Sequence, residues 1–165
     1  WNSVVTLNNW HQHRISRLIT KKLFGTLSNK KIGILGFAFK ANTNDTRESA
    51  AIRICKDLLA EGAILYIHDP KVNPYQILRD LSNEENIHSL EKKRLFFTDH
   101  IEEAAEGSDA LLVLTEWEIY SNINWNNISK LMRSPAWIFD SRSILDPNTV
   151  RTEGLNLWRI GDGAH

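Results

Sequence analysis

Short, continuously apolar runs alternate with helix-like segments along most of the chain, and this alternation limits the fold more than any single motif does. The runs that predict strands cover residues 31–35, 63–70, 94–98, 109–117, 136–141 and 156–160. Strands that are apolar throughout are typical of a parallel sheet whose two faces are covered by helices. The pattern therefore predicts an α/β fold with a Rossmann-like, doubly wound and mostly parallel sheet.

The segments between these runs carry apolar residues at helical spacing. In the first segment, roughly residues 2–26, the apolar positions between Ile15 and Leu23 form one stripe. Further helices are predicted at residues 49–61, 73–81, 101–107 and around 125–132, and residues 82–93 are polar enough to predict a surface loop. We expect one domain with an N-terminal appendage.

Charge and cysteine content exclude several classes of protein. The chain has 20 Lys and Arg against 20 Asp and Glu, so its formal net charge is zero. Nucleic acid and anionic membranes are bound by basic surfaces, and neither is an expected partner. No apolar segment approaches the roughly 20 residues of a membrane span, and the N-terminal stretch does not resemble a signal peptide. The single cysteine, Cys55, cannot form an internal disulfide, which favours the cytoplasm.

In sheets of this kind, ligands bind beyond the carboxyl ends of the strands. The residues at these positions are 37–40, Asp69, 115–117 and 140–143. A dinucleotide fingerprint after the first strand needs three spaced glycines, so that the backbone can approach a pyrophosphate. Gly36 stands alone there and is followed by Phe-Ala-Phe. We therefore do not expect this loop to bind NAD in the standard way.

The loop between the first strand and the next helix, GFAFKANTNDTRES (36–49), carries two cations instead. Asp45 is expected at the helix N-cap, with Glu48 completing a capping box, and this places Arg47 in the first helical turn. A cation in that turn is unfavourable unless it serves an anion. With Lys40, the loop is a candidate anion site. The alternative is that Arg47 simply pairs with Asp45 or a neighbouring acid.

Four segments occur in an order and spacing that resemble one enzyme family. They are GFAFKANTNDTRESAA, HDPKV, LLVLTEW and FDSRSILD, and they are spread over almost the whole chain. Together they resemble the C-terminal, UDP-binding domain of the UDP-glucose/GDP-mannose dehydrogenase family. The TRES and FDSR segments favour the UDP-glucose 6-dehydrogenase branch. The resemblance implies that this domain holds the UDP part of UDP-glucose, while a separate N-terminal domain holds NAD.

The resemblance also assigns roles to four residues. The family residues that match Phe39 and Lys40 contact the substrate, and the arginine that matches Arg142 contacts UDP-glucose. The arginine that matches Arg47 reaches the NAD bound to the other domain. The loop is thus expected to make side-chain contacts across a domain interface.

The resemblance further implies a division of the chain and an absence of catalytic residues. Residues 1–28 would be the last part of an interdomain helix that contributes to a homo-oligomer contact, and residues 29–165 the UDP-sugar-binding domain. The family's catalytic cysteine, its lysine and aspartate partners and its NAD fingerprint lie before the point where this chain begins. The chain alone is therefore expected to be inactive. Cys55 lies on an apolar helical stripe and is expected to be an inert packing residue.

Other interpretations stay open at this stage. The chain could be the equivalent domain of a dehydrogenase for UDP-N-acetylmannosamine or GDP-mannose, or an NAD-binding module. A receiver-like signalling domain would need an acidic cluster for a divalent cation, for which Asp69 and Asp140 are too few. The histidines match no metal-site spacing, and no metal is expected.

Two strand-end acids have two readings each. Asp140 either orients Arg142 for the substrate or caps the loop after its strand. Asp69 either binds a ribose hydroxyl or shapes the turn that contains Pro70. In both cases the local, structural role is the preferred prediction. Glu116 and Trp117 belong to the TEW segment, and no role is assigned to them.

Overall fold

The computed structural model describes residues 13–82 and 93–162, and the strands of these residues form one sheet. The strands are β1 (Lys31–Leu35), β2 (Ile64–His68), β3 (Leu95–Phe97), β4 (Ala110–Val113), β5 (Trp137–Asp140) and β6 (Asn156–Arg159). Their order is β3-β2-β1-β4-β5-β6, and every neighbouring pair is parallel. The predicted Rossmann-like fold is confirmed, with a sheet that is entirely rather than mostly parallel.

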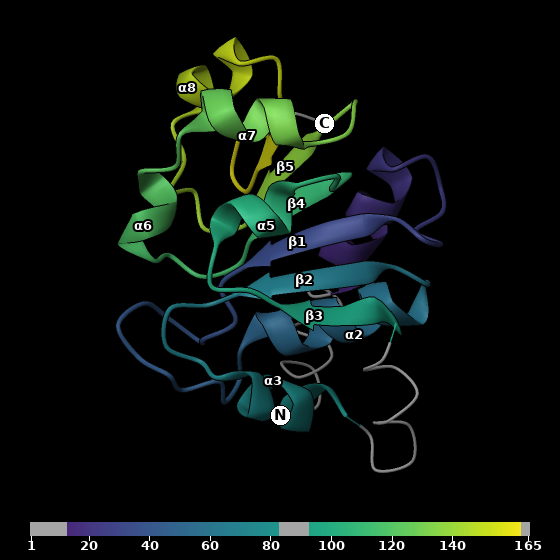
Figure 1. The fold of residues 1–165 in the computed structure, drawn as a ribbon, viewed down its shortest axis with the longest axis vertical. Helices are drawn as coiled ribbons and strands as arrows, with labels where there is room; N and C mark the ends of the chain where they lie inside the picture. The colour runs from purple at the N-terminus through teal and green to yellow at the C-terminus, as the bar shows by residue number, and fades with distance from the viewer. Residues whose placement is uncertain (1–12, 83–92, 163–165) are drawn as a thin grey trace.

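Helices cover both faces of this sheet, as its apolar strands require. They are α2 (Ala50–Ala60), α3 (Pro74–Leu81), α5 (Ile101–Ala105), α6 (Glu118–Ser121), α7 (Trp125–Leu131) and α8 (Pro147–Thr152). Figure 1 shows α5 and α7 in front of the sheet, with α2 and α3 behind it. All four residues of the central strand β4 are buried. Among the helices of residues 13–82 and 93–162, none combines the length and apolar character that a bilayer span requires.

The N-terminal segment contributes a helix, residues 13–22, to the same hydrophobic core. Ile19 and Leu23 are almost completely buried, and Leu27 follows them into the core. The predicted amphipathic helix is thus confirmed over its described part, while residues 2–12 of the predicted segment lie outside the described residues.

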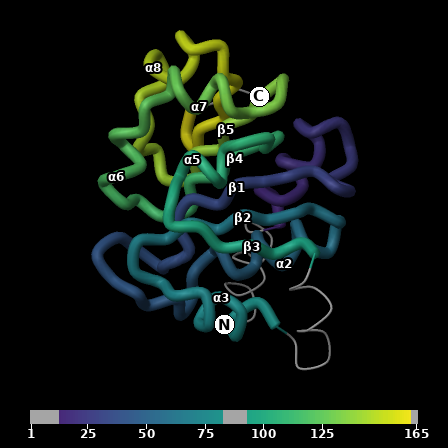
Figure 2. Tube along the Cα trace, viewed as in Figure 1, coloured from purple at the N-terminus to yellow at the C-terminus, as the bar shows by residue number. Residues whose placement is uncertain are grey.

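The parallel arrangement brings the functional loops together. Because every strand points the same way, the loops after β1, β2, β4 and β5 lie at one edge of the sheet, as the trace in Figure 2 shows. The chain winds outward from β1 in one direction and from β4 in the other, so the crevice between these two strands is the topological switch point. This is the usual ligand position in open α/β sheets.

The start of α2 corrects one prediction from the sequence. Asp45 is not the N-cap, because the backbone at Glu48 adopts a left-handed conformation with φ of 61° that no α-helix can include. Ser49 caps the helix instead, since its side chain accepts a hydrogen bond from the Ala51 N–H. Arg47 therefore lies before the helix, and the argument from the helix dipole does not apply to it.

Candidate functional site

The turn after β1 approaches the end of β4 very closely. Gly36 has φ of 97°, and a Cβ atom built on it would lie 2.4 Å from Thr115 Cβ. Thr115 Oγ1 also donates a 2.8 Å hydrogen bond to the Ala38 carbonyl. The glycine that the sequence places here is therefore required for close contact between two strand ends rather than for contact with a pyrophosphate.

A carboxylate occupies the backbone donors of this turn. Asp69, which follows β2, accepts hydrogen bonds at Oδ2 from the N–H groups of Phe37 (2.7 Å) and Ala38 (3.0 Å) and from Trp117 Nε1 (3.2 Å). Its Oδ1 accepts from Lys71 N and Val72 N. The N–H groups that would face a phosphate in a dinucleotide loop are thus already bonded to a protein anion. Asp69 shapes the turn, as preferred from the sequence, and it also ties three strand-end loops together.

Arg142, which follows β5, lies against the β1 loop. Its Nη2 donates to the Phe39 carbonyl at 3.0 Å and lies 2.6 Å from Glu116 Oε2. Glu116 also accepts a 3.0 Å hydrogen bond from the Ala41 N–H at Oε1. The side chains of Phe39 and Arg142 remain partly exposed. The structure therefore brings together two of the predicted substrate contacts and adds Glu116, for which the TEW segment gave no signal.

The two cations of the loop after β1, Lys40 and Arg47, have different surroundings. Lys40 is exposed, and among the described residues its amine has no hydrogen-bond or ion-pair partner. Arg47 forms a two-pronged ion pair with Asp45, with Nη2 and Oδ2 2.8 Å apart. This pair lowers the pKa of Asp45 to about 2, chiefly through the hydrogen bonds from Arg47. The pairing that the sequence left open is present, and the Arg47 side chain is still 87% exposed.

Asp140 caps the loop after β5, which is the structural one of its two predicted roles. Its side chain is fully buried and accepts hydrogen bonds from the N–H groups of Arg142 (3.0 Å) and Leu145 (2.9 Å). It therefore fixes the backbone of the loop that carries Arg142, and does not contact the guanidinium group.

Neither the cysteine nor a metal-type cluster of side chains in the described residues offers a separate site. Cys55 is buried, and burial raises the pKa of its thiol, which agrees with the inert role predicted for it. No group of three or more His, Cys, Asp or Glu side chains suited to a metal ion occurs in residues 13–82 and 93–162.

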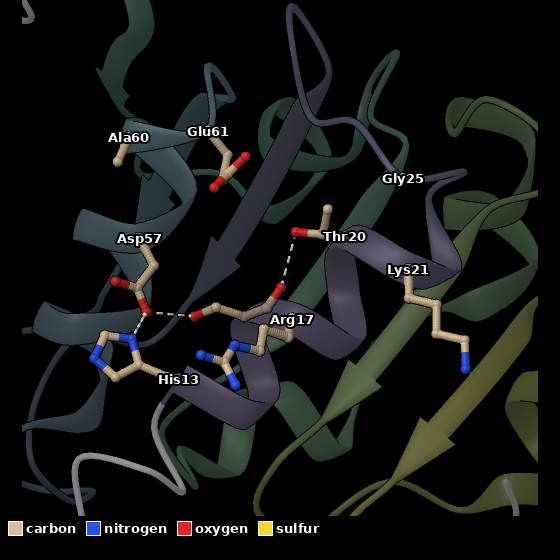
Figure 3. Close-up of a pocket in the computed structure, with 9 residues that line it drawn as sticks. His13, Arg17, Thr20, Lys21, Gly25, Asp57, Ala60 and Glu61 are labelled. Carbon is tan, nitrogen blue, oxygen red and sulfur yellow. Dashed lines mark hydrogen bonds and ion pairs between the residues drawn. The ribbon is translucent and has the colours of Figure 1, made fainter.

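A pocket of about 490 Å³, large enough for a small molecule, lies between the N-terminal helix and α2. Figure 3 shows His13, Arg17 and Lys21 on the helix side, with Asp57 on α2 and Glu61 at its C-terminal end. His13 Nδ1 and Ser16 Oγ each lie 2.9 Å from Asp57 Oδ2, so the Asp57 carboxylate already has protein partners. None of the strand-end residues lines this pocket. We interpret it as the junction that fastens the N-terminal helix to α2.

His68, the last residue of β2, and Tyr120 form a buried pair. His68 Nδ1 lies 2.9 Å from the Tyr120 hydroxyl, which also donates to the His68 carbonyl. Burial lowers the pKa of His68, although nearby acids, first among them Asp69, act in the opposite direction. The folded protein therefore keeps this histidine neutral at a pH where the unfolded chain protonates it.

This pair predicts a pH dependence of stability. As pH falls below about 6.5, the unfolded chain takes up a proton at His68 before the folded chain does, so the free energy of unfolding decreases. Urea unfolding at pH 7.5, 6.5 and 5.5 should show this decrease, and His68→Asn should make it shallower. The exposed His100→Asn is the control. An identical pH dependence in the wild type and His68→Asn would contradict this role of His68.

The fold and the strand-end loops together define a class of protein: a Rossmann-like α/β domain whose turn after β1 lacks a glycine-rich phosphate loop and whose loops carry Lys40, Arg47 and Arg142. The chain belongs to the UDP-glucose/GDP-mannose dehydrogenase family, because residues 33–147 match the model of that family's UDP binding domain.

Curated relatives support this membership. The chain is 42% identical over 163 residues to UDP-glucose 6-dehydrogenase of Drosophila melanogaster, which covers 98% of this chain and 34% of the relative. It is 37% identical over 171 residues to UDP-glucose 6-dehydrogenase 4 of Arabidopsis thaliana, covering 98% of this chain and 36% of the relative. The chain thus spans about a third of the length of the curated relatives it matches.

Solved structures agree on the fold. A UDP-glucose dehydrogenase from Pyrobaculum islandicum superposes with a TM-score of 0.68 at 22% identity, covering 96% of this chain and 31% of that one. An NDP-N-acetyl-D-galactosaminuronic acid dehydrogenase from Methanosarcina mazei Go1 gives a TM-score of 0.72 at 23% identity, covering 93% and 29% of the two chains. At these identities the likeness concerns the fold alone.

Proposed function

We propose that this chain is the C-terminal, UDP-binding domain of a UDP-glucose 6-dehydrogenase, a cytoplasmic enzyme that oxidises UDP-glucose to UDP-glucuronate with two NAD. The observation that carries the proposal is the position of Arg142 beside the Phe39–Ala41 segment, at the switch point between β1 and β4. A guanidinium group there suits the diphosphate of a nucleotide sugar, and the exposed amine of Lys40 adds a second cation to the same loop.

The turn after β1 argues against an NAD site in this domain. Because Asp69 occupies the N–H groups of Phe37 and Ala38, the turn does not fit the pyrophosphate of NAD. NAD would be held by a separate N-terminal domain, and the chain alone would be inactive. Residues 1–28 would connect the two domains and contribute to a homo-oligomer. In this arrangement, no residue of the chain is catalytic.

Arg47 is the chain's proposed contact with that NAD. Asp45 pairs with its guanidinium group, and the side chain stays exposed, so it can meet a group outside this domain. In the longer enzyme, Arg47→Ala should raise the KM for NAD more than the KM for UDP-glucose. Equal increases in both constants would argue for a structural role.

The sequence relatives support glucose as the sugar of the substrate. Curated relatives at 41–42% identity are UDP-glucose 6-dehydrogenases, and this supports UDP-glucose over UDP-N-acetylmannosamine or GDP-mannose. Titration of the chain with UDP-glucose, UDP-N-acetylmannosamine and GDP-mannose in parallel tests the choice. UDP-glucose is expected to bind tightest, and preferential binding of GDP-mannose would refute the proposal.

A further inference from the structure

Glu116 links the two segments that form the candidate site. It lies three residues after β4, and its two carboxylate oxygens serve different partners. Oε1 accepts the Ala41 N–H of the β1 loop, while Oε2 pairs with Nη2 of Arg142 from the β5 loop. One side chain in the loop after the central strand β4 thus contacts loops from both sides of the switch point.

The contacts of Arg142 leave one part of its guanidinium group available. Nη2 makes both protein contacts, to Glu116 and to the Phe39 carbonyl. Within the described part of the chain, Nε and Nη1 have no hydrogen-bond partner. An arginine carries five N–H donors in a planar fork, so a guanidinium group fixed at Nη2 still offers donors to an anion.

Fixing the guanidinium group matters because a long arginine side chain loses rotamer entropy when it is ordered. A protein contact that orders it before the ligand arrives removes part of that cost from binding. Partial burial alone would raise the pKa of Glu116, but the hydrogen bond from Ala41 and the charge of Arg142 outweigh it and lower that pKa. Glu116 is therefore ionised at neutral pH and able to hold Arg142.

We propose that Glu116 is a positioning residue for nucleotide-sugar binding: it holds Arg142 and the Phe39–Ala41 segment in the arrangement that receives the diphosphate. This inference rests on the proposed function. Glu116 does not touch the ligand in this arrangement, and it acts through Arg142.

The sign of the mutational effect separates this role from simpler ones. A carboxylate near a bound diphosphate repels it, so its removal should tighten binding if Glu116 only adds charge or competes with the ligand for Arg142. If Glu116 positions Arg142, its removal should weaken binding despite that relief of repulsion.

The experiment is a titration of the chain with UDP-glucose at one fixed salt concentration, using Glu116→Ala and Glu116→Gln. We expect Glu116→Ala to weaken binding about 5- to 20-fold, as for loss of one charge-assisted contact, and Glu116→Gln to weaken it less, because its amide keeps one acceptor. Glu118→Gln, an exposed acid two residues further on, removes the same charge and should bind as tightly as the wild type or slightly tighter.

A second measurement reports the position of Arg142 without any ligand. In 15N NMR relaxation, the Arg142 Nε–H group should be ordered in the wild type and Glu118→Gln, and mobile in Glu116→Ala. Equal mobility in all three would overturn the inference, as would unchanged or tighter UDP-glucose binding by Glu116→Ala. Those results leave the proposed function intact if the wild type binds UDP-glucose. Failure of the wild type to bind UDP-glucose would overturn both.

Discussion

Replacing Asp69 by alanine is expected to lower the free energy of unfolding by about 3 to 5 kcal/mol, among the largest effects for a single residue of this chain. The carboxylate accepts five hydrogen bonds, from four backbone N–H groups and the Trp117 indole. Alanine leaves all of these donors without their partner, including the N–H groups of the buried Phe37 and Ala38. Urea unfolding at pH 7 measures the difference.

Asparagine at the same position tests the reason for this effect. All five partners of Asp69 are donors, and asparagine offers one acceptor oxygen and one NH2 group. Either orientation of the amide turns a donor toward two or more N–H groups, so Asp69→Asn should also destabilise the fold, by about 2 to 3 kcal/mol. Asp99→Asn, an exposed acid after β3, is the matched control. An Asp69→Asn variant as stable as this control would contradict the hydrogen-bond network.

Replacing Arg142 by alanine is expected to weaken UDP-glucose binding by about 1 to 3 kcal/mol, or about 5- to 150-fold. The guanidinium group lies on the surface of the site, so the melting temperature should change little. Titration calorimetry of the variant and the wild type, with thermal unfolding of both, gives the two quantities. An unchanged affinity would remove Arg142 from the site.

Two controls sharpen this second result. Arg133→Ala removes an exposed arginine near Asp109, which precedes β4 at the opposite edge of the sheet, and should leave the affinity unchanged. This comparison separates a local contact from a general loss of positive charge. Arg142→Lys keeps the charge but not the planar fork, and should bind more weakly than the wild type.

The fold was predictable from the sequence because its signal is repeated along the chain. Each predicted strand run contains one strand of the sheet. The signal is clearest in the central strands, since four of the five residues of β1 and all four of β4 are buried. The short helices α6 and α8 were not predicted. With four and six residues, they show little helical periodicity. The equally short α5 was predicted with the help of Gly107, which marks its end.

The site was predictable only in part. Phe39 and Arg142 were expected to lie near one another, because loops that follow parallel strands leave the same edge of the sheet. The local turn at Asp69 was predicted, but its bonds to the β1 loop and the role of Glu116 depend on contacts between loops that are distant in sequence, and no local pattern encodes these. The error at Asp45 has the same origin: both Asp45 and Ser49 are good N-caps, and the left-handed backbone at Glu48 selects the second.

The most direct test of the proposed function is titration calorimetry of the 165-residue chain with UDP, UDP-glucose and NAD in parallel. UDP and UDP-glucose are expected to bind, because Arg142 and Lys40 present cations at the switch point. NAD is expected not to bind, because Asp69 already occupies the backbone donors of the β1 turn. Binding of NAD without either uridine ligand would contradict the assignment of this site.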